Sequence, residues 1–206
     1  MGIASAWAGW LDYHRANGFA VEHFLNPPAA PGAVAALGDA IGFAIPDDLS
    51  QLWSHADGQI DIFSIDDPAP GAIVSPLFGS YAFCPTEEAL RQYRLWQDVR
   101  AQGLSGVDDA ITVRGDDPVY AEYWRPGWLP FALDGGGNAY AVDLSPPPGG
   151  TYGQIIVIGP DEDRRRILAP GIAALLADAS ARRPALDHSQ GEPPQVFFDM
   201  ESAGGA

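Results

Sequence analysis

Apolar side chains recur at every third or fourth position in five stretches of the chain, and this spacing predicts five amphipathic helices. Three of them fall within about the first 60 residues, where breakers that contain Pro and Gly separate them. The fourth spans about residues 84–103, with Thr86 as the candidate N-cap and with Glu87 and Glu88 at the positive end of the helix dipole. The fifth, over about residues 170–181, closes the predicted fold.

A second pattern, in which large apolar residues occupy every other position, predicts β-strands later in the chain. Residues 129–133 and 140–144 alternate in this way on either side of a run of three glycines. Two such runs joined by Asp-Gly-Gly-Gly-Asn are typical of a β-hairpin whose turn needs positive φ angles. Pro130 cannot donate a hydrogen bond to a neighbouring strand, so its strand is expected at an edge or with a bulge. The continuous apolar run at 154–159 predicts a strand covered on both faces.

The order of these elements indicates the fold class. Helices and strands are segregated along the chain, whereas an α/β protein alternates them. The expected fold is therefore α+β, with a central, mostly antiparallel sheet and helices packed around it. We expect an N-terminal helical extension over residues 1–32, the α+β domain over 33–181, and a polar, poorly ordered tail over 182–206. Residues 196–198 of that tail are a candidate for docking on the body.

The formal net charge of −16 narrows the classes of partner. Residues 1–103 carry 12 acids and 4 arginines, and residues 104–206 carry 15 acids and 7 arginines, so each half nets −8. The whole body is acidic, and such a surface repels nucleic acids and anionic membranes while it attracts basic proteins. No apolar run approaches the roughly 18 residues that span a membrane. The N-terminus lacks the pattern of a signal peptide, so we expect a soluble, cytoplasmic protein.

The three glycines raise the question of a phosphate-binding loop, and the surrounding residues exclude one. A Walker loop needs a lysine after its last glycine, but all 11 basic residues of this chain are arginines. The dinucleotide-binding fingerprint needs Gly-x-Gly-x-x-Gly before a helix, whereas Tyr140 occupies the third glycine position and a strand pattern follows it. The hairpin residues are therefore predicted to be structural: Asp134, Gly135, Gly136, Gly137 and Asn138.

Catalytic and metal-binding motifs are absent from the sequence. None of the four histidines pairs at a metal-ligand spacing, and there is no Gly-x-Ser-x-Gly elbow. The single cysteine, Cys84, is expected to be buried between a strand and a helix start. We therefore expect no metal, cofactor or catalytic residue. One enzymatic alternative stays open, because paired carboxylates for sugar chemistry meet only in the fold, and Trp124 and Trp128 are surface candidates for stacking on a sugar.

Two segments in a fixed order resemble a known family. IGFAIPDDLSQLWSHADGQ (41–59) has a helix end, a proline, two acids and a helix with an aromatic residue. WRPGWLPFALDGGGNAYAVDLSPPPGGTYGQIIVIG (124–159) has Trp-x-Pro, the hairpin and a further apolar strand. Over about residues 34–180 this order resembles the SUKH superfamily, the Smi/Knr group of cell-wall regulators and bacterial immunity proteins. The resemblance implies an α+β fold with a central antiparallel sheet, and it implies no catalytic residue.

Together these observations favour a non-enzymatic protein-binding module. The leading hypothesis is an immunity protein that neutralises a basic, nuclease-type toxin, because the surface is acidic. The alternative that the resemblance implies is a regulatory scaffold of cell-wall or envelope assembly, and a carbohydrate-binding or glycoside-active protein is the third hypothesis. The candidate partner-binding residues lie in acidic loops and before the hairpin: Asp57, Asp61, Asp66, Asp67, Asp108, Asp109, Asp116, Asp117, Glu122 and Trp124.

Overall fold

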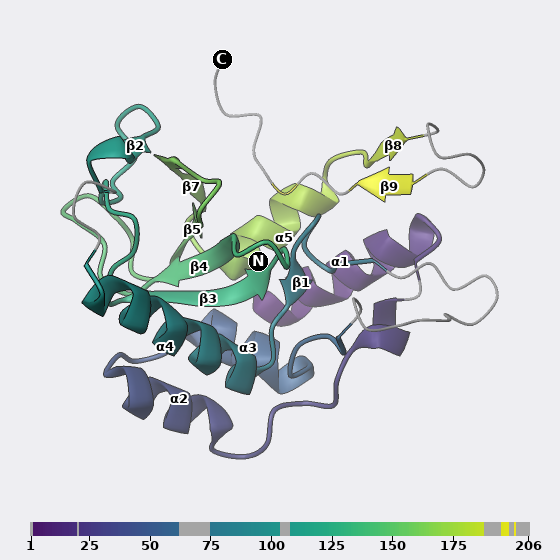
Figure 1. Cartoon of the computed structure of the whole chain (residues 1–206). Helices are drawn as coiled ribbons and strands as arrows, with labels where there is room; N and C mark the ends of the chain where they lie inside the picture. Colours follow the sequence, from purple (N-terminus) through teal and green to yellow (C-terminus); the bar gives the residue numbers. More distant parts are fainter. Residues whose placement is uncertain are drawn as a thin grey trace.

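The structure of the chain is a computed structural model that describes residues 2–19, 21–61, 75–103, 108–187, 195–197 and 200. Within these residues, five α-helices surround a five-stranded antiparallel sheet, so the expected α+β architecture is confirmed (Figure 1). Helices and sheet contribute to one shared hydrophobic core. The candidate residues Asp66 and Asp67 lie outside the described residues.

The central sheet has the strand order β1-β3-β4-β5-β7, and every neighbouring pair is antiparallel. Its strands are β1 (Ala82–Phe83), β3 (Trp128–Leu133), β4 (Ala139–Asp143), β5 (Gln154–Ile158) and β7 (Ile167–Ala169). Every residue of β4 and β5 is buried, and since successive side chains point to opposite faces, both faces of the sheet are covered. The expected irregularity at Pro130 is present, because the β3–β4 register shifts between Pro130 and Ala132.

The five helices predicted from the apolar spacing are confirmed: α1 (Ile3–Ala16), α2 (Ala33–Ile41), α3 (Asp47–His55), α4 (Thr86–Ala101) and α5 (Ile172–Ser180). α1 packs along α5, and α3 touches both of them. α4 lies alongside β3, and α2 packs against α4 (Figure 1). Trp7 and Trp10 of α1 belong to the same core as the sheet. The expected boundary between an N-terminal extension and the domain stays a prediction.

Shorter elements connect this framework: η1 (Val21–Phe24), η3 (Asp108–Ala110), β2 (Thr112–Val113), β6 (Arg164–Arg165), β8 (Ala185–Asp187) and β9 (Gln195–Phe197). β2 pairs with β6 in parallel, and β8 pairs with β9 antiparallel. Both strands of the β8–β9 pair lie in the tail over 182–206, and strands of three residues are too short to leave a periodic pattern in the sequence. The expectation that this tail is poorly ordered stays a prediction. Met200, in the same tail, is buried in the core.

The turn between β3 and β4 is the hairpin predicted from the glycine run. Gly135 and Gly137 have φ angles of +81° and +103°, which residues with a side chain rarely adopt. The Asp134 carboxylate accepts the backbone N–H groups of Gly136 and Asn138 at 2.7 and 3.0 Å, and it accepts a further hydrogen bond from Asn138 Nδ2 at 2.7 Å. The carboxylate and the two glycines therefore define the turn together.

Two helix starts are held by aspartates that are distant in sequence. Asp57 accepts the N–H of Thr86 at 2.7 Å and its hydroxyl at 3.3 Å, at the start of α4. Asp48 accepts the N–H of Ile172 at 2.7 Å, at the start of α5. The expected N-cap role of Thr86 is wrong, because Pro85 occupies that position and Thr86 is already helical. One aspartate lies within α3 and the other just after it, so this helix orients both α4 and α5.

Trp124 and Trp128 were expected at the surface, and this expectation is wrong. Both side chains are 0% exposed. The ring of Trp124 meets Tyr93 of α4 edge to face, with 5.3 Å between ring centres. The guanidinium of Arg165 lies 5.8 Å from the ring centre of Trp128. Their place in a loop-rich stretch predicted exposure, but that stretch is covered by α4 and β6, so neither ring can stack on a sugar.

Candidate binding cleft beside strand β1 and helix α4

A cleft of about 420 Å³ opens beside β1 and the first turns of α4. Four parts of the chain line it: residues 59–61 after α3, residues 82–85, Glu88, Arg91 and Gln92 of α4, and Leu133 and Gly135 at the hairpin. The structure thus brings together Asp61 and Gly135, two residues that the sequence had singled out for separate reasons. It surrounds them with apolar and charged side chains that the sequence analysis did not select.

Gln59 closes the outer edge of β1 at the base of this cleft. Its backbone N–H donates to the carbonyl of Phe83 at 2.8 Å, and its Oε1 accepts the N–H groups of Phe83 and Leu77 at 3.0 and 2.7 Å. Its Nε2 donates to the carbonyl of Ser75 at 3.0 Å. Because Gln59 is only 3% exposed, these bonds are shielded from water. Both backbone groups of Phe83 on this edge are therefore occupied.

The charged side chains of the cleft sum to a negative charge. Arg91 binds Glu88 through two hydrogen bonds of 2.6 and 2.5 Å, so its guanidinium is neutralised within α4. These hydrogen bonds raise the pKa of Arg91. Asp61 adds an exposed carboxylate from the segment after α3. Two carboxylates and one guanidinium thus line the cleft.

The cleft also reaches Cys84, whose predicted burial is confirmed. Its side chain is 3% exposed, and burial raises the pKa of the thiol far above its usual range. A nucleophilic cysteine needs a thiolate, which an electropositive and partly exposed environment stabilises. Neither condition holds here, so the cleft presents a surface for contact and not a reactive thiol.

Two of the three large apolar side chains that are exposed in the described part of the chain belong to this region. Ile60 lines the cleft and is 37% exposed. Leu95 is 50% exposed and lies on α4 one turn beyond Arg91, on the same face of the helix. The third, Tyr152, lies elsewhere and donates its hydroxyl to the carbonyl of Ala44. Exposed apolar groups beside a concave surface are typical of sites that bind other proteins.

A larger hollow of about 670 Å³ lies between α2 and residues 42–45. Asp39 is its single charged lining residue, and Ser50 of α3 is a further polar one. None of the residues predicted for the site lines this hollow. The cleft beside β1 is therefore the better candidate, because it combines apolar and charged groups from four parts of the chain.

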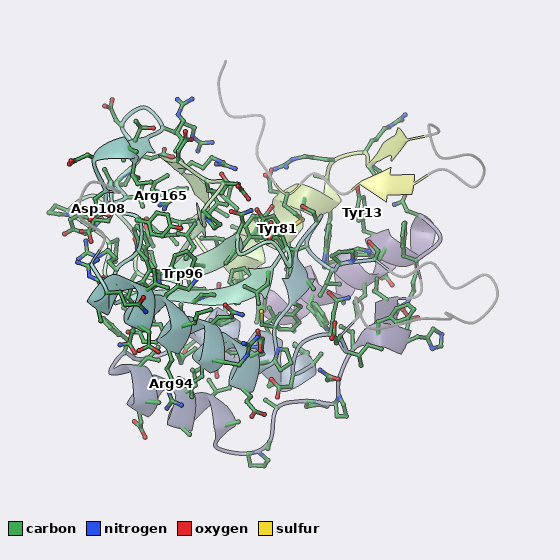
Figure 2. All side chains as sticks on the ribbon, viewed as in Figure 1. Tyr13, Tyr81, Arg94, Trp96, Asp108 and Arg165 are labelled. Carbon is green, nitrogen blue, oxygen red and sulfur yellow. The ribbon has the colours of Figure 1, made fainter. Side chains whose placement is uncertain are left out.

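The structure separates the predicted acidic residues into two groups. Three are exposed, namely Asp61, Asp109 and Asp116. Four are half-buried, and hydrogen bonds or ion pairs tie them to neighbouring segments: Asp57, Asp108, Asp117 and Glu122. Figure 2 shows Asp108 at the β2 end of the molecule, whereas Asp61 lines the cleft at the β1 end. The predicted acids that the structure describes therefore do not form one site.

A buried polar cluster without a recognisable sequence signal joins β6 to the segment before β3. Arg165 is 0% exposed, and its guanidinium donates to the carbonyls of Glu122 at 2.9 Å, Tyr123 at 2.7 Å and Glu162. Burial lowers the pKa of Arg165 to about 10, so the side chain is still charged at neutral pH. The run of three arginines in the sequence carries no sign of which one is buried. The cluster fixes loops and leaves no group of Arg165 facing solvent.

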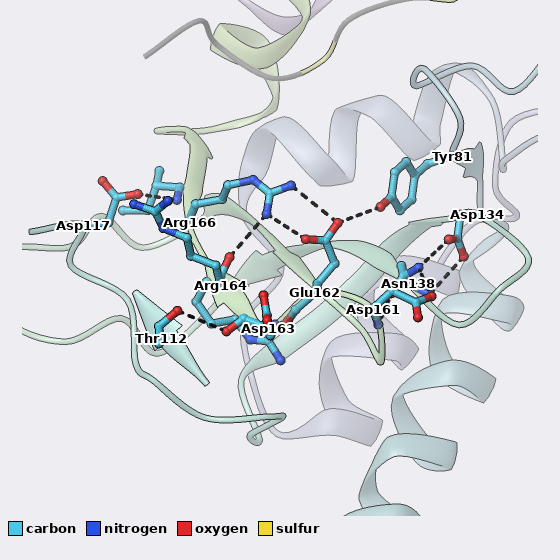
Figure 3. A network of polar contacts seen from close by, with 12 residues as sticks. Tyr81, Thr112, Asp117, Asp134, Asn138, Asp161, Glu162, Asp163, Arg164 and Arg166 are labelled. Carbon is cyan, nitrogen blue, oxygen red and sulfur yellow. Dashed lines mark hydrogen bonds and ion pairs between the residues drawn. The ribbon is translucent and has the colours of Figure 1, made fainter. Parts of the chain in front are cut away.

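Asn138 connects the hairpin to the turn after β5 (Figure 3). Its Nδ2 donates to Asp161 Oδ2 at 3.1 Å, and its Oδ1 accepts the N–H of Asp161 at 3.0 Å. Further along that turn, Glu162 binds Arg166 at 2.7 Å and accepts a hydrogen bond of 3.5 Å from the hydroxyl of Tyr81. The carboxylates beside the hairpin thus hold loops together.

The described residues contain no group of three or more His, Cys, Asp or Glu side chains that could hold a metal ion. Two of the histidines take part in aromatic packing, since His14 is buried on α1 and His55 stacks on Trp7 with 6.3 Å between ring centres. None of the helices in this part of the chain is long and apolar enough to cross a membrane.

The geometry thus defines an α+β domain with a cleft beside β1 that mixes apolar and charged side chains. The sequence profile of the SMI1/KNR4 family (SUKH-1) matches residues 28–178. The chain therefore belongs to this family, and the resemblance seen in its motifs is confirmed.

Similar proteins are named as regulators of the cell wall. The chain is 24% identical to the cell wall assembly regulator SMI1 of Saccharomyces cerevisiae, over 95% of the chain and 44% of that protein. It is 38% identical to the cell wall biosynthesis/cell cycle regulator smi1 of Schizosaccharomyces pombe, over 44% of the chain and 20% of that protein. It is 42% identical to the glucan synthesis regulatory protein of Neurospora crassa, over 44% of the chain and 17% of that protein. The matched regions span less than half the length of each relative.

Proposed function

We propose that this chain is a non-enzymatic protein-binding module that acts as a regulatory scaffold in cell-wall or envelope assembly. The observation that carries the proposal is the similarity to the Saccharomyces cerevisiae cell wall assembly regulator, which extends over 95% of the chain. Two further relatives have names of the same kind. The cleft beside β1 supports a binding role, because exposed Ile60 and Asp61 lie side by side in its lining. A place in the cytoplasm is part of the proposal.

The names of these relatives favour the regulatory role over the immunity role that the sequence analysis ranked first. An immunity protein was expected because an acidic surface suits a basic toxin. None of the three relatives described above is named as an immunity protein. In the regulatory role, too, the acidic surface attracts basic partner proteins.

The sugar-active hypothesis loses its main support in the structure. It depended on Trp124 and Trp128 as stacking platforms, and both rings are fully buried. It also needed a pair of available carboxylates, but Asp57, Asp117 and Glu122 are engaged in helix capping, strand-edge contacts and ion pairs. These contacts weaken the argument for a pair of catalytic carboxylates at these three positions.

Deletion of the gene in its own organism tests the proposed function. We expect the deletion strain to lose tolerance to an agent that weakens its cell wall, and we expect a plasmid copy of the gene to restore that tolerance. Unchanged tolerance and unchanged wall composition in the deletion strain would overturn the proposal. In a second arm, the product of the neighbouring gene is expressed with and without this protein. Rescue from toxicity in that arm, with a normal wall, would return the immunity hypothesis to first place.

A further inference from the structure

We propose that the cleft beside β1 binds a short segment of a partner protein in which an aliphatic side chain stands next to a basic one. The proposal rests on the proposed function, because it names the chemistry of the partner that a protein-binding module would take. The aliphatic side chain packs on Ile60 and Leu133, and the basic side chain lies against Asp61. All three residues line the cleft.

The size and lining of the cleft suit a few side chains. Its volume of about 420 Å³ is at the lower end of the range for ligand pockets, so it holds part of a peptide and not a folded domain. Ile60 is 37% exposed, and covering it with an aliphatic group removes apolar surface from water. Leu95, which is 50% exposed, adds an apolar side chain on the same face of α4, one turn beyond Arg91.

The mode of binding follows from Gln59. An extended peptide often adds a strand to an open sheet edge and gains affinity from backbone hydrogen bonds. That route is closed at β1, because Gln59 already pairs with the N–H and the carbonyl of Phe83. Affinity must then come from side chains, so the segment is recognised by its sequence, with an aliphatic anchor and a neighbouring charge.

The sign of that charge follows from the lining and from the whole chain. Among the lining side chains, Asp61 and Glu88 are acidic and Arg91 is basic, and Arg91 is bound by both oxygens of Glu88. The net charge of the chain is −16, so the field around the cleft attracts cations over a longer range. A second copy of this chain would bring another −16 to a negative cleft, which disfavours self-association there. A basic segment of another protein is the complementary occupant.

A peptide-display selection tests the proposal. Random heptapeptides are selected on the immobilised full chain, after binders to a variant with Ile60→Ser and Asp61→Asn have been removed. We expect the surviving peptides to share Leu, Ile or Val next to Arg or Lys. Surviving peptides without basic residues, or a selection in which the wild-type chain retains no more peptide than the variant, would overturn the proposal.

Titration of the labelled consensus peptide, followed by fluorescence anisotropy, gives the second readout. We expect Ile60→Ser to weaken binding about tenfold, because an aliphatic contact is lost. Asp61→Asn should weaken it about threefold at low salt, and this difference should vanish at about 0.5 M NaCl, where exposed charges are screened. Affinity that is unchanged in both variants contradicts the assignment of the cleft.

Two matched substitutions outside the cleft serve as controls. Tyr152→Ser removes the third exposed large apolar side chain, and Asp109→Asn removes an exposed acid at the η3 turn. Both should bind the peptide as the wild type does, and circular dichroism should show that all four variants are folded at the temperature of the titration. A loss of binding in the controls equal to that in the cleft variants would show a nonspecific surface effect and overturn the proposal.

The deletion strain separates this proposal from the proposed function. If wild-type protein restores wall tolerance but no peptide distinguishes the cleft variants, the function stands and the cleft assignment fails. If the peptide binds as expected but deletion leaves the wall unchanged, the cleft is a binding site and the cell-wall role fails. If both hold, the Ile60→Ser, Asp61→Asn variant should complement the deletion poorly.

Discussion

The two outer strands of the central sheet are both closed by polar residues, a neutral glutamine at β1 and a charged pair at β7. At β1, Gln59 pairs with the N–H and the carbonyl of Phe83. At β7, Asp117 accepts the N–H of Ile167 at 2.9 Å, and Arg114 donates to the carbonyl of Ile167 at 2.7 Å. At β7 two side chains take the place of a neighbouring strand, and at β1 the side chain and the backbone N–H of Gln59 do so together, which blocks strand addition at that residue.

The two edges differ in what would happen if the side chain were lost. Gln59 is 3% exposed, so its partners would be left buried without a hydrogen bond. The side chains of Arg114 and Asp117 are 26% and 22% exposed, so water can reach the groups they serve. The buried, neutral contacts at β1 therefore form a rigid base for the cleft. At β7 water can replace the charged side chains as hydrogen-bond partners, and salt weakens their ion pair.

The substitution Gln59→Leu should break the β1 edge. Leucine has a volume similar to that of glutamine, but its side chain cannot form hydrogen bonds. The N–H groups of Phe83 and Leu77 and the carbonyl of Ser75 therefore lose their partners. At about 1–3 kcal/mol for each buried unsatisfied group, we expect the free energy of unfolding to fall by about 4 kcal/mol. Urea denaturation followed by circular dichroism measures this loss.

Gln92→Leu is the matched control for this substitution. Gln92 is a half-buried glutamine of the same cleft whose Nε2 donates to Glu88, so its loss should cost under about 1 kcal/mol. An equal fall in the free energy of unfolding in the two variants would mean that the hydrogen bonds of Gln59 at the β1 edge contribute no more to stability than the bond of Gln92.

The β1 side should also weaken in acid, through His14. Its Nε2 donates to the carbonyl of Leu77, and the N–H of the same Leu77 is held by Gln59. Burial lowers the pKa of His14 from 6.5 to about 4, so the unfolded chain binds the proton more readily. His14 therefore adds full stability above pH 6.5, and this stability declines as the pH falls from 6.5 towards 4. A shift of this size corresponds to about 3 kcal/mol at pH 4.

A comparison with His14→Phe isolates this effect. Phenylalanine keeps an aromatic ring beside Trp10 and cannot be protonated, and Trp10 Nε1 still donates to the carbonyl of Leu77 at 3.1 Å. The stability difference between wild type and variant, measured by urea denaturation from pH 7.5 to 4, should shift in favour of the variant below pH 6.5. Parallel stability curves across that interval would rule out His14 as the titrating group.

The capping contact next to Gln59 should have a smaller effect. Asp57→Ala removes the acceptor for the N–H and hydroxyl of Thr86, and loss of an N-terminal cap costs about 1–2 kcal/mol. Asp57→Asn keeps an oxygen acceptor and should stay within about 0.5 kcal/mol of the wild type. Thermal unfolding of both variants checks the order, and an asparagine variant as unstable as the alanine variant would contradict a capping role.

These contacts show how far a single sequence predicts this fold. Apolar spacing predicted the five helices, and alternation around Asp-Gly-Gly-Gly-Asn predicted the β3–β4 hairpin, because both signals act within a few residues. The cap that Asp57 provides for α4 joins residues 29 positions apart, and the Asp48 contact with α5 spans 124 positions. No local pattern encodes such pairs, so Thr86 was chosen as the cap from its position alone.

The candidate site was predictable only in part, and for the same reason. Asp61 stood out as one of a group of loop acids, and the structure places it in a cleft. Ile60 and Arg91 gave no signal, because an exposed isoleucine and a helical arginine are ordinary until other segments surround them. Trp124 and Trp128 were predicted to be exposed but are buried, because the buried Arg165 that covers their segment is 37 or more residues away in the sequence.

The charged edge at β7 should respond least and depend on salt. Arg114→Met together with Asp117→Asn removes the 3.1 Å ion pair and the bond to the carbonyl of Ile167, while the asparagine oxygen still accepts the Ile167 N–H. Because water replaces the lost donor, we expect the free energy of unfolding to fall by about 1 kcal/mol, and by less at about 0.5 M NaCl. Arg15→Met, which breaks exposed ion pairs of α1, should produce no measurable change. If the free energy of unfolding fell as much as in Gln59→Leu, and by the same amount at low and high salt, the difference in burial between the two edges would have no effect on stability.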